Sequence, residues 1–589
     1  MLASILLLHL VVGLGLITSS DRLGARAFAV AAIAPAVSIV LLATEATDIV
    51  DGTPVLASLT WIEQLSLGFE LRLDSMALVM ASIVVGVGVL VCVYAVGYFS
   101  HPGPGIGRLA GLLTLFAGAM LGIAFSDHLL SLFVFWELTS VTSYLLIGND
   151  DQNPGARAAA RSAILITGAG GLVMLAGIVL VGQSTGSYLL SELVASPPSG
   201  TTVAVGAALV LVGAFTKSAQ FPFGGWLPGA MVAPTPISTY LHAATMVKAG
   251  VFLVARLAPA LGELDPWRPL VLTVASVTML TGAWRALRQH DLKLLLAYGT
   301  VSQLGFMMLL FGASEYPIAQ AGIVLLIAHA AFKAALFMVV GIVDHQTGTR
   351  DIRHLHGFGA GWRPVIAVSV LGAASMAGVP PLLGFIAKEK ALDGYLEASF
   401  AGGGAVLAVI VVGSIFTFAY SARFVLGVTG RFGVVDDTAE PEFDSPSAPA
   451  PSALFVGPSV LLAGLSLLFG LAPVLIDDVV RAATTDLYLD AKPKHVVLWA
   501  GLNTALVLSV TIIAVGAALV VLRRPVEQLQ RRAHRLVAWA PDADRSFNAS
   551  VDGVATLGRR TTAFLQNGSL PAYLVVILAV VALAPFIPA

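Results

Sequence analysis

Apolar residues run through this chain in stretches of about 20 residues, which is the length a helix needs to cross the hydrocarbon core of a bilayer. Short polar segments separate these stretches from one end of the chain to the other. The pattern predicts an all-α polytopic membrane protein with about 16 transmembrane helices. The predicted spans lie near residues 1–18, 27–45, 75–98, 108–125, 128–148, 161–182, 201–222, 236–258, 269–287, 293–312, 317–343, 363–396, 404–427, 453–475, 499–522 and 570–588.

Charged residues between the predicted spans alternate in sign along the chain. Segments after odd-numbered spans carry arginine, and segments after even-numbered spans carry aspartate or glutamate. Loops that stay in the cytoplasm are enriched in Lys and Arg, so the amino terminus is predicted to be external. Residues 477–494 carry both signs and depart from the alternation. Residues 1–18 lack a basic start and precede many more spans, so they are expected to form the first helix rather than a signal peptide.

Composition excludes several classes of function. The chain is 57% hydrophobic and 11% charged, and its net charge of −2 indicates no nucleic-acid partner. Its single cysteine, Cys92, allows neither an internal disulfide nor a cysteine-ligated cluster. Because phosphate-loop and His-Glu-x-x-His motifs are missing from the sequence, we expect no catalytic residues, no metal site and no cofactor.

Proline interrupts two of the predicted spans. Pro222 falls in span 7 and Pro380-Pro381 in span 12, and each should split its helix. Five spans separate the breaks, so the broken helices should run in opposite senses, as in two inverted five-helix repeats made of spans 4–8 and 9–13. Two ordinary proline kinks are the alternative.

The predicted parts are 1–107 (helices 1–3), 108–258 (first repeat), 269–427 (second repeat), 453–522 (helices 14 and 15), 525–568 and 570–589.

The last two parts have different predicted roles. Residues 525–568 place apolar residues at helical spacing and arginines on the other side, which predicts an amphipathic lateral helix along the cytoplasmic face. A connecting loop is the alternative interpretation. Residues 570–589 are predicted to be the carboxy-terminal anchor helix.

Ionisable residues inside the predicted spans are the strongest functional signal. A charged side chain at the bilayer centre costs roughly 2.5–3.5 kcal/mol on insertion scales, so several of them indicate an ion pathway. Glu137 lies midway along span 5 and Lys217 in span 7. If they lie close together, they would form a coupled pair that a moving proton could switch. A static ion pair that holds two helices together is the alternative.

Further candidates follow along the chain. On an ideal helix, His242 and Lys248 of span 8 would point roughly 120° apart, so that one could pass a proton onward from the other. His329 and Lys333 of span 11 are four residues apart and share a helix face. For the histidines, a hydrogen bond to a helix neighbour is the alternative role. The site set is completed by Lys293, Lys388, His345 and Glu389.

Long blocks of the sequence resemble a known family. Residues 135–140 (FWELTS), 214–250, 290–306 (HDLKLLLAYGTVSQLGF) and 329–351 are similar to the antiporter-like subunits shared by respiratory complex I and Mrp cation/proton antiporters. The segments around Lys248 and 341–351 are most similar to the large A-type subunit of Mrp antiporters. The resemblance implies that Glu137 and Lys217 form the proton-pumping pair and that His242 and Lys248 relay protons. It also implies a central hydrophilic axis of Lys293, His329 and Lys333, with Lys388 as its terminal lysine.

The resemblance implies a secondary transporter rather than an enzyme. The chain would be the proton-translocating subunit of a multisubunit Na⁺/H⁺ or other monovalent cation/proton antiporter in a bacterial cytoplasmic membrane, driven by the proton-motive force. Its partner subunits would be of the Mrp B to G type. Two alternatives are the homologous pumping subunit of a quinone-reducing NADH dehydrogenase and a non-transporting structural subunit. The A-type subunit usually continues into further helices, whereas this sequence stops at Ala589. This difference predicts either that the chain is a fragment or a split form of the subunit, or that the complex I alternative holds. The sodium site is therefore expected outside this chain.

Overall fold

The computed structural model describes residues 1–19, 23–62, 67–100, 105–355, 357–431 and 448–523, with scattered positions from 525 to 578. Residues Met1–Glu527 form one compact unit and Gln528–Ala589 form a second. Apart from a helical piece at 556–563 and single positions, the predicted lateral helix (525–568) and anchor helix (570–589) lie outside the described residues.

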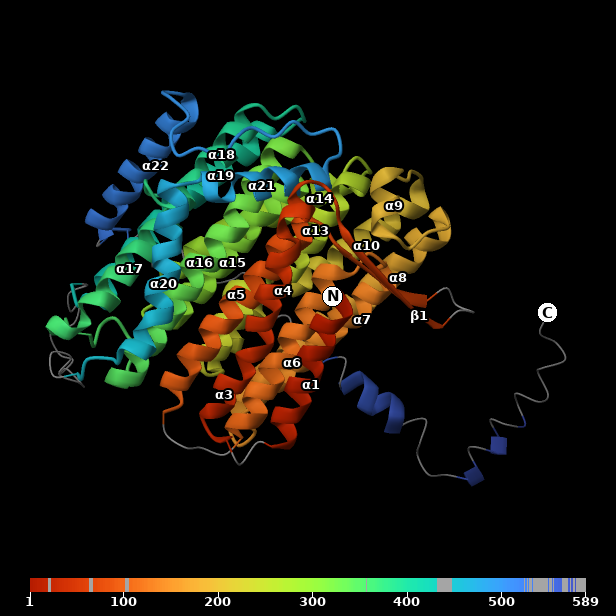
Figure 1. Ribbon diagram of the computed structural model, residues 1–589, viewed down its shortest axis with the longest axis horizontal. Helices are drawn as coiled ribbons and strands as arrows, with labels where there is room; N and C mark the ends of the chain where they lie inside the picture. Colours follow the sequence, from red (N-terminus) through yellow and green to blue (C-terminus); the bar gives the residue numbers. More distant parts are fainter. Residues whose placement is uncertain are drawn as a thin grey trace. The chain divides into compact units, whose positions relative to one another are not determined.

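The first unit is mostly helical (Figure 1). In the described part of the chain, eleven helices are long and apolar enough to cross a membrane, and the chain is a multi-pass membrane protein. The helices up to residue 261 are α1 (Leu2–Thr18), α3 (Arg26–Ala31), α4 (Ile33–Val50), α5 (Ser75–Tyr98), α6 (Ile106–Phe125), α7 (Leu129–Ile147), α8 (Pro154–Thr185), α9 (Leu190–Ala195), α10 (Thr201–Lys217), α11 (Trp226–Gly229), α12 (Thr235–Thr239) and α13 (Lys248–Leu261). Those that follow are α14 (Trp267–Ala286), α15 (Leu292–Gly312), α16 (Tyr316–Thr347), α17 (Arg363–Met376), α18 (Leu383–Leu396), α19 (Gly403–Val428), α20 (Ala453–Leu471), α21 (Val474–Leu487) and α22 (Thr504–Val521).

Every predicted span from 1–18 to 499–522 contains helix, but the helix in span 7 ends before the predicted boundary and the helix in span 12 is divided in two. In span 7, α10 ends at Lys217 and short helical turns resume at Phe223. In span 12, α17 ends at Met376 and α18 begins at Leu383. The interruptions fall at the predicted prolines, which lack the N–H that a continuing helix needs.

Span 8 is also interrupted, and the prediction of one ideal helix over 236–258 is wrong. A π-helical turn over Tyr240–Ala244 follows α12, Thr245 leaves the helical region with φ −131° and ψ −96°, and α13 begins only at Lys248. The roughly 120° angle expected between His242 and Lys248 therefore does not apply. This span carries no central proline; the Thr245 hydroxyl instead donates to the Tyr240 carbonyl oxygen at 2.7 Å.

A β-hairpin corrects the all-α prediction. β1 (Val55–Ile62) and β2 (Leu67–Leu73) pair in antiparallel fashion, with Val55 opposite Leu73. These segments are too short to span a membrane as helices, and their apolar and β-branched residues suit paired strands. The hairpin leads directly into α5.

Helix α16 lies at the centre of the packing. It contacts α5, α12, α15, α17, α18, α20 and α21, and it is almost wholly buried. A membrane helix that is apolar on all sides and enclosed by others leaves its few polar groups shielded from lipid. Any ionisable group on α16 therefore lies in the interior of the bundle.

A buried ion pair joins three parts of the first unit at one end of the bundle. Arg256 of α13 lies 2.6 Å from the carboxylate of Asp74, and both side chains are at most 8% exposed. Asp74 also caps α5 by accepting a hydrogen bond from the Ala77 amide, while Asp486 of α21 accepts one from Ser75 N at 2.6 Å. The cluster connects α5, α13 and α21.

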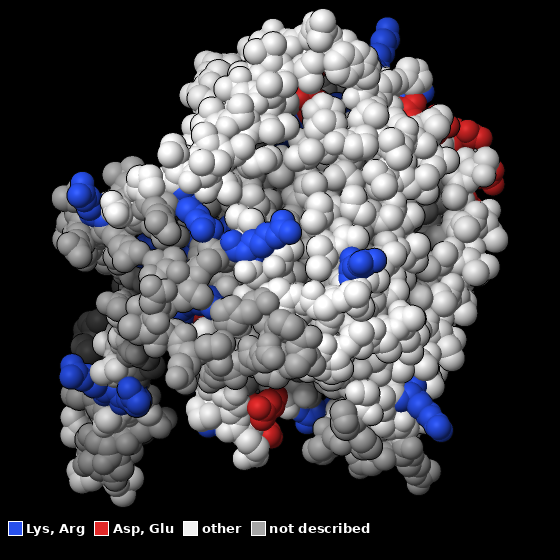
Figure 2. Space-filling model, turned by 90° about the vertical axis from the view of Figure 1, so that its left-hand side faces the viewer, with Lys and Arg blue, Asp and Glu red and all other residues white. Residues whose placement is uncertain are grey.

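Uncharged residues make up most of the described surface on the side shown in Figure 2, and Lys and Arg side chains occur there singly or in small groups. Leu172 of α8 and Val507 of α22 are examples of large apolar side chains that are mainly exposed. Such a surface is expected where helices face lipid or other membrane subunits.

Candidate ion pathway

Lys217 is the last residue of α10 and is fully buried. The helix ends there because Ala219 adopts a left-handed φ of 51° and Pro222 follows. The Lys217 Nζ donates to the Trp136 carbonyl oxygen at 3.0 Å and to Ser140 Oγ at 2.6 Å. It also lies 5.0 Å from the centre of the Trp136 ring. The amine is thus held against one turn of α7.

Glu137 belongs to the same part of α7. Its Oε1 atom is buried without a hydrogen-bond partner among the described residues. A β-carbon at Gly171 of α8 would overlap this oxygen, so a glycine at this position leaves room for the Glu137 carboxylate. The charges of Glu137 and Lys217 act on each other, although the lysine's hydrogen bonds go to Trp136 and Ser140. The structure brings the predicted pair together without a direct hydrogen bond.

Three predicted residues converge on α16. Lys248, the first residue of α13, donates to the Leu326 carbonyl oxygen of α16 at 3.2 Å. Lys333, on α16 itself, donates to the Leu296 carbonyl oxygen of α15 at 3.1 Å. His329 lies within the electrostatic reach of both lysines, and neither of its ring nitrogens has a hydrogen-bond partner among the described residues. The main chain of Ala243 on the π-helical turn also acts on this ring, so His329 interacts with another segment rather than with a neighbour on its own helix.

His242 lies on the π-helical turn, away from Lys248. Its ring centre is 6.1 Å from that of Trp226, and its Nδ1 atom is buried without a partner in the described part of the chain. Lys293 lies close enough for its charge to act on the His242 ring. The Lys293 Nζ donates to the Ala233 carbonyl oxygen at 2.6 Å. His242 and Lys293 thus form a second group of candidates.

Lys293 stands near one end of the bundle. It follows Asp291, the residue that caps α15. Arg350 contacts Asp291 at 2.7 Å and Asp344 at 3.4 Å, so charged groups surround this end. His345 is exposed here and contacts aromatic rings, and the structure does not bring it into the buried set.

Lys388 and Glu389 lie on α18, just after the break in span 12. The Lys388 Nζ donates to the Gly378 carbonyl oxygen at 2.7 Å. Gly378 has a φ of +68°, and a β-carbon there would meet the lysine side chain at 2.9 Å, so glycine is needed on both counts. Glu389 Oε1 is buried without a partner among the described residues. These residues lie together, as their adjacent positions require.

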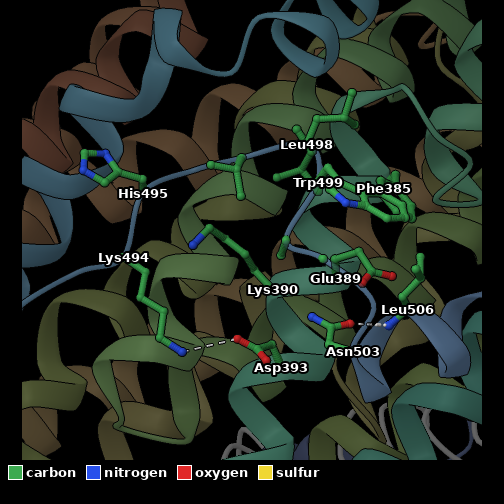
Figure 3. Close-up of a pocket in the computed structure, with 14 residues that line it drawn as sticks. Phe385, Glu389, Lys390, Asp393, Lys494, His495, Leu498, Trp499, Asn503 and Leu506 are labelled. Atoms are coloured by element: carbon green, nitrogen blue, oxygen red, sulfur yellow. Dashed lines mark hydrogen bonds and ion pairs between the residues drawn. The ribbon is translucent and has the colours of Figure 1, made fainter.

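A cavity of about 150 Å³ adjoins Glu389. Figure 3 shows that α18 and the segment 494–506 enclose it, with Glu389, Lys390, Asp393 and Asn503 among its polar lining. Lys494 of the segment lies 3.5 Å from Asp393. Phe385, Ile386 and Trp499 also line the cavity, so its wall is mixed, and its polar groups are the places where water would bind. It places Glu389 next to a space that sequence reasoning did not identify.

The candidate lysines share one feature. Lys217, Lys248, Lys293, Lys333 and Lys388 are at most 3% exposed, and each donates to a main-chain carbonyl oxygen of another segment. Within the described residues, none of them forms an ion pair with a carboxylate. A buried amine without a counter-ion is costly in its charged form, so such a group is suited to gaining and losing protons.

Sequence reasoning missed the oxygens that hold these amines. Ser140 could have been predicted from the sequence, because it lies in the same block as Glu137 and three residues further along the helix. The main-chain carbonyls carry no signal in the sequence. In the described part of the chain, no group of three or more His, Cys, Asp or Glu side chains could hold a metal ion.

Comparison with known proteins places this geometry in a family. Residues 126–417 match the family model described as NADH:quinone oxidoreductase/Mrp antiporter, and residues 59–108 match that of the complex I chain 5 amino terminus. The A-type subunit of the Na⁺/H⁺ antiporter of Alkalihalophilus pseudofirmus is 36% identical over 549 residues, which are 88% of this chain and 67% of the relative. The chain belongs to the family of A-type subunits of Na⁺/H⁺ antiporters.

Other members of this family and its structural relatives agree with the placement. The A/B-type subunit of a probable K⁺/H⁺ antiporter of Rhizobium meliloti is 39% identical over 79% of this chain and 46% of its own length. The Mrp complex of Dietzia sp. contains a chain with a TM-score of 0.84 and 37% identity, which covers 99% of this chain and 62% of that one. This chain thus spans roughly half to two thirds of the length of these relatives.

The fold extends beyond the A-type subunits. A chain of respiratory complex I from Thermus thermophilus has a TM-score of 0.70 at 23% identity, over 84% of this chain and all of that one. At this identity the similarity shows a shared fold alone.

Proposed function

We propose that this chain conducts protons as one subunit of a multisubunit Na⁺/H⁺ or other monovalent cation/proton antiporter. The observation that carries the proposal is the set of buried lysines that donate to main-chain carbonyls and, in the described residues, form no ion pairs. The names of the A-type relatives support the reaction class.

The proposed route has two clusters and an opening at each end. Glu137 and Lys217 form the first cluster, and Lys248, His329 and Lys333 form the second around α16. Proton arrival at one member changes the charge that its neighbours experience, so the groups titrate together. His242 and Lys293 would connect the route with the end of the bundle that carries Arg350, which is predicted to be cytoplasmic.

Lys388 and Glu389 would form the opening on the other side of the membrane. Glu389 faces the cavity of Figure 3, whose lining continues to the exposed Lys494. Water held by the polar groups of this cavity would connect the carboxylate with the surface. This gives the terminal lysine of the row access to the side predicted to be external, from which protons enter when the proton-motive force drives cation export.

The finer architecture belongs to the same proposal. It comprises sixteen spans, a first repeat over 108–258 and a second, inverted repeat over 269–427. The breaks after Lys217 and Met376 support inverted repeats, because discontinuous helices at matching positions are a mark of such transporters. A lateral helix over 525–568 and an anchor over 570–589 would complete the architecture.

The proposed orientation places the amino terminus outside a bacterial cytoplasmic membrane. With Cys92 replaced by serine, a Thr53→Cys variant should react with an impermeant maleimide in intact cells, and an Arg288→Cys variant should not, although both positions are exposed. Both cysteines should react after the membrane is opened, which controls for accessibility. The reverse labelling in intact cells would show that the orientation is wrong.

The cation route is proposed to lie with partner subunits of the Mrp B to G type. The ionisable groups within the candidate pathway are mainly lysine and histidine, which suit protons and repel cations, whereas a dehydrated sodium ion needs several oxygen ligands. Reconstituted alone, the chain should therefore show at most a proton leak.

The test compares proteoliposomes that contain the chain alone with membranes that contain its co-purified partners. Sodium-dependent dissipation of a proton gradient is expected only with the partners. Robust sodium/proton exchange by the isolated chain would overturn the assignment of the cation route. Co-purification with NADH dehydrogenase subunits, without sodium-dependent flux, would overturn the proposed function in favour of the complex I alternative.

A further inference from the structure

Ser218 sits between the broken ends of spans 7 and 8. It follows Lys217 and is completely buried. Its hydroxyl donates to the Val247 carbonyl oxygen at 2.7 Å and accepts a hydrogen bond from Val251 N at 3.1 Å. Val247 directly precedes Lys248, the first residue of α13. One side chain thus connects the helix end that carries Lys217 with the helix start that carries Lys248.

The two groups that Ser218 joins are four residues apart in α13. In an uninterrupted α-helix, Val251 N would donate directly to the Val247 carbonyl oxygen. The serine hydroxyl stands between them and satisfies both groups, so it is inserted into the first turn of α13. A side chain inserted into the hydrogen-bond ladder is a known cause of local helix opening.

Close packing keeps the hydroxyl in this position. Gly250 lies in the same turn of α13, and a β-carbon there would overlap both Ser218 Oγ and the Ala214 carbonyl oxygen of α10. The glycine therefore lets the two backbones approach until the serine can reach the ladder. The preceding segment is already open, because Thr245 leaves the helical region.

We propose that Ser218 is a positioning residue that couples Lys217 to Lys248 through the first turn of α13. With the hydroxyl inserted, the serine bridges Val251 N and the Val247 carbonyl oxygen, and Lys248 reaches the Leu326 carbonyl oxygen. With the hydroxyl withdrawn, it bonds instead to the Ala214 carbonyl oxygen of its own segment, Val251 N bonds directly to the Val247 carbonyl oxygen, the turn tightens and Lys248 moves. Two arrangements with satisfied hydrogen bonds form a two-state element that movement of the Lys217 segment can bias.

Hydrogen exchange tests this switch without reference to transport. A Ser218→Ala variant loses the inserted hydroxyl, so the direct bond should form and exchange in peptides covering 247–255 should slow by about 3-fold or more. A serine that only fills space predicts the opposite, because its removal loosens the packing and speeds exchange. Faster or unchanged exchange in the assembled variant would overturn the proposal.

Transport gives the second readout, which rests on the proposed function. In the assembled complex, Ser218→Ala should lower the maximal rate of sodium-dependent proton flux by about 10-fold or more and leave the half-saturating sodium concentration unchanged. Ser218→Cys retains a weak donor and should recover part of the rate. Ser459→Ala is the control, because Ser459 is equally buried but bonds to the Val456 carbonyl oxygen of its own helix, α20.

The outcomes separate the two proposals. If Lys217→Ala abolishes flux while Ser218→Ala transports like the wild type, the Ser218 switch is wrong and the proton route stands. If the wild-type complex shows no sodium-dependent proton flux, the proposed function is wrong. The exchange measurement still decides whether Ser218 controls the first turn of α13.

Discussion

Replacing Lys217 by alanine should lower sodium-dependent proton flux through the assembled complex by at least about 100-fold, as expected for loss of a positioned proton-transfer group. The amine is fully buried and donates to Trp136 and Ser140, so no other side chain can take over its position. Glu137→Gln should cause a loss of similar size, because an amide, unlike a carboxyl group, does not bind and release a proton near neutral pH. Flux is measured by the decay of a proton gradient in everted vesicles after sodium addition.

The matched control is Lys492→Ala, the same chemical change at an exposed position. It should transport at the wild-type rate. Because Lys217 forms no direct ion pair within the described residues, Lys217→Ala breaks no direct ion pair there, and complex assembly should persist, which blue native gels can verify. An assembled Lys217→Ala or Glu137→Gln complex with wild-type flux would rule out this pair as the switch.

Replacing Arg256 by alanine should destabilise the first unit by about 3–5 kcal/mol, the cost of leaving a buried charge without its partner. Arg256 pairs with Asp74 at 2.6 Å, where both side chains are nearly inaccessible. Burial alone would raise the pKa of Asp74, but Arg256, the Ala77 amide and Arg72 outweigh it and hold this pKa below its ordinary value. Thermal unfolding in mild detergent measures the loss.

Arg353→Ala is the control for this prediction. Arg353 lies 2.6 Å from Asp351, but its side chain is 52% exposed, so its loss should cost no more than about 1 kcal/mol. Because the pKa of Asp74 is lowered in the fold, its stabilisation is present at neutral pH and fades as the pH falls through that pKa. The Arg256→Ala defect should therefore shrink in acid. Equal losses for Arg256→Ala and Arg353→Ala would contradict the burial argument.

The sequence predicts the membrane class and most helices because lipid imposes a simple rule. Each apolar stretch of about 20 residues must satisfy its backbone internally, and a helix does so. Proline marks the breaks after Lys217 and Met376, since it lacks an N–H. The hairpin over 55–73 and the break at Thr245 escaped prediction, because pairing between short strands and a turn without proline depend on packing.

The candidate residues also follow from sequence, because each lysine in an apolar span is conspicuous on its own. Their grouping does not. Sequence spacing cannot show that Lys248 and Lys333 both lie near His329, because these contacts join helices that are distant along the chain.

The amino-acid sequence by itself determined the membrane class, most of the helices and most of the buried ionisable residues, because apolar length and charge in lipid are local properties. Only the tertiary structure decided which oxygen each lysine meets, that His345 is exposed, and that Ser218 enters the first turn of α13. A main-chain carbonyl is the same in every residue. Which carbonyl a buried amine reaches is therefore fixed by how the helices break and pack against one another.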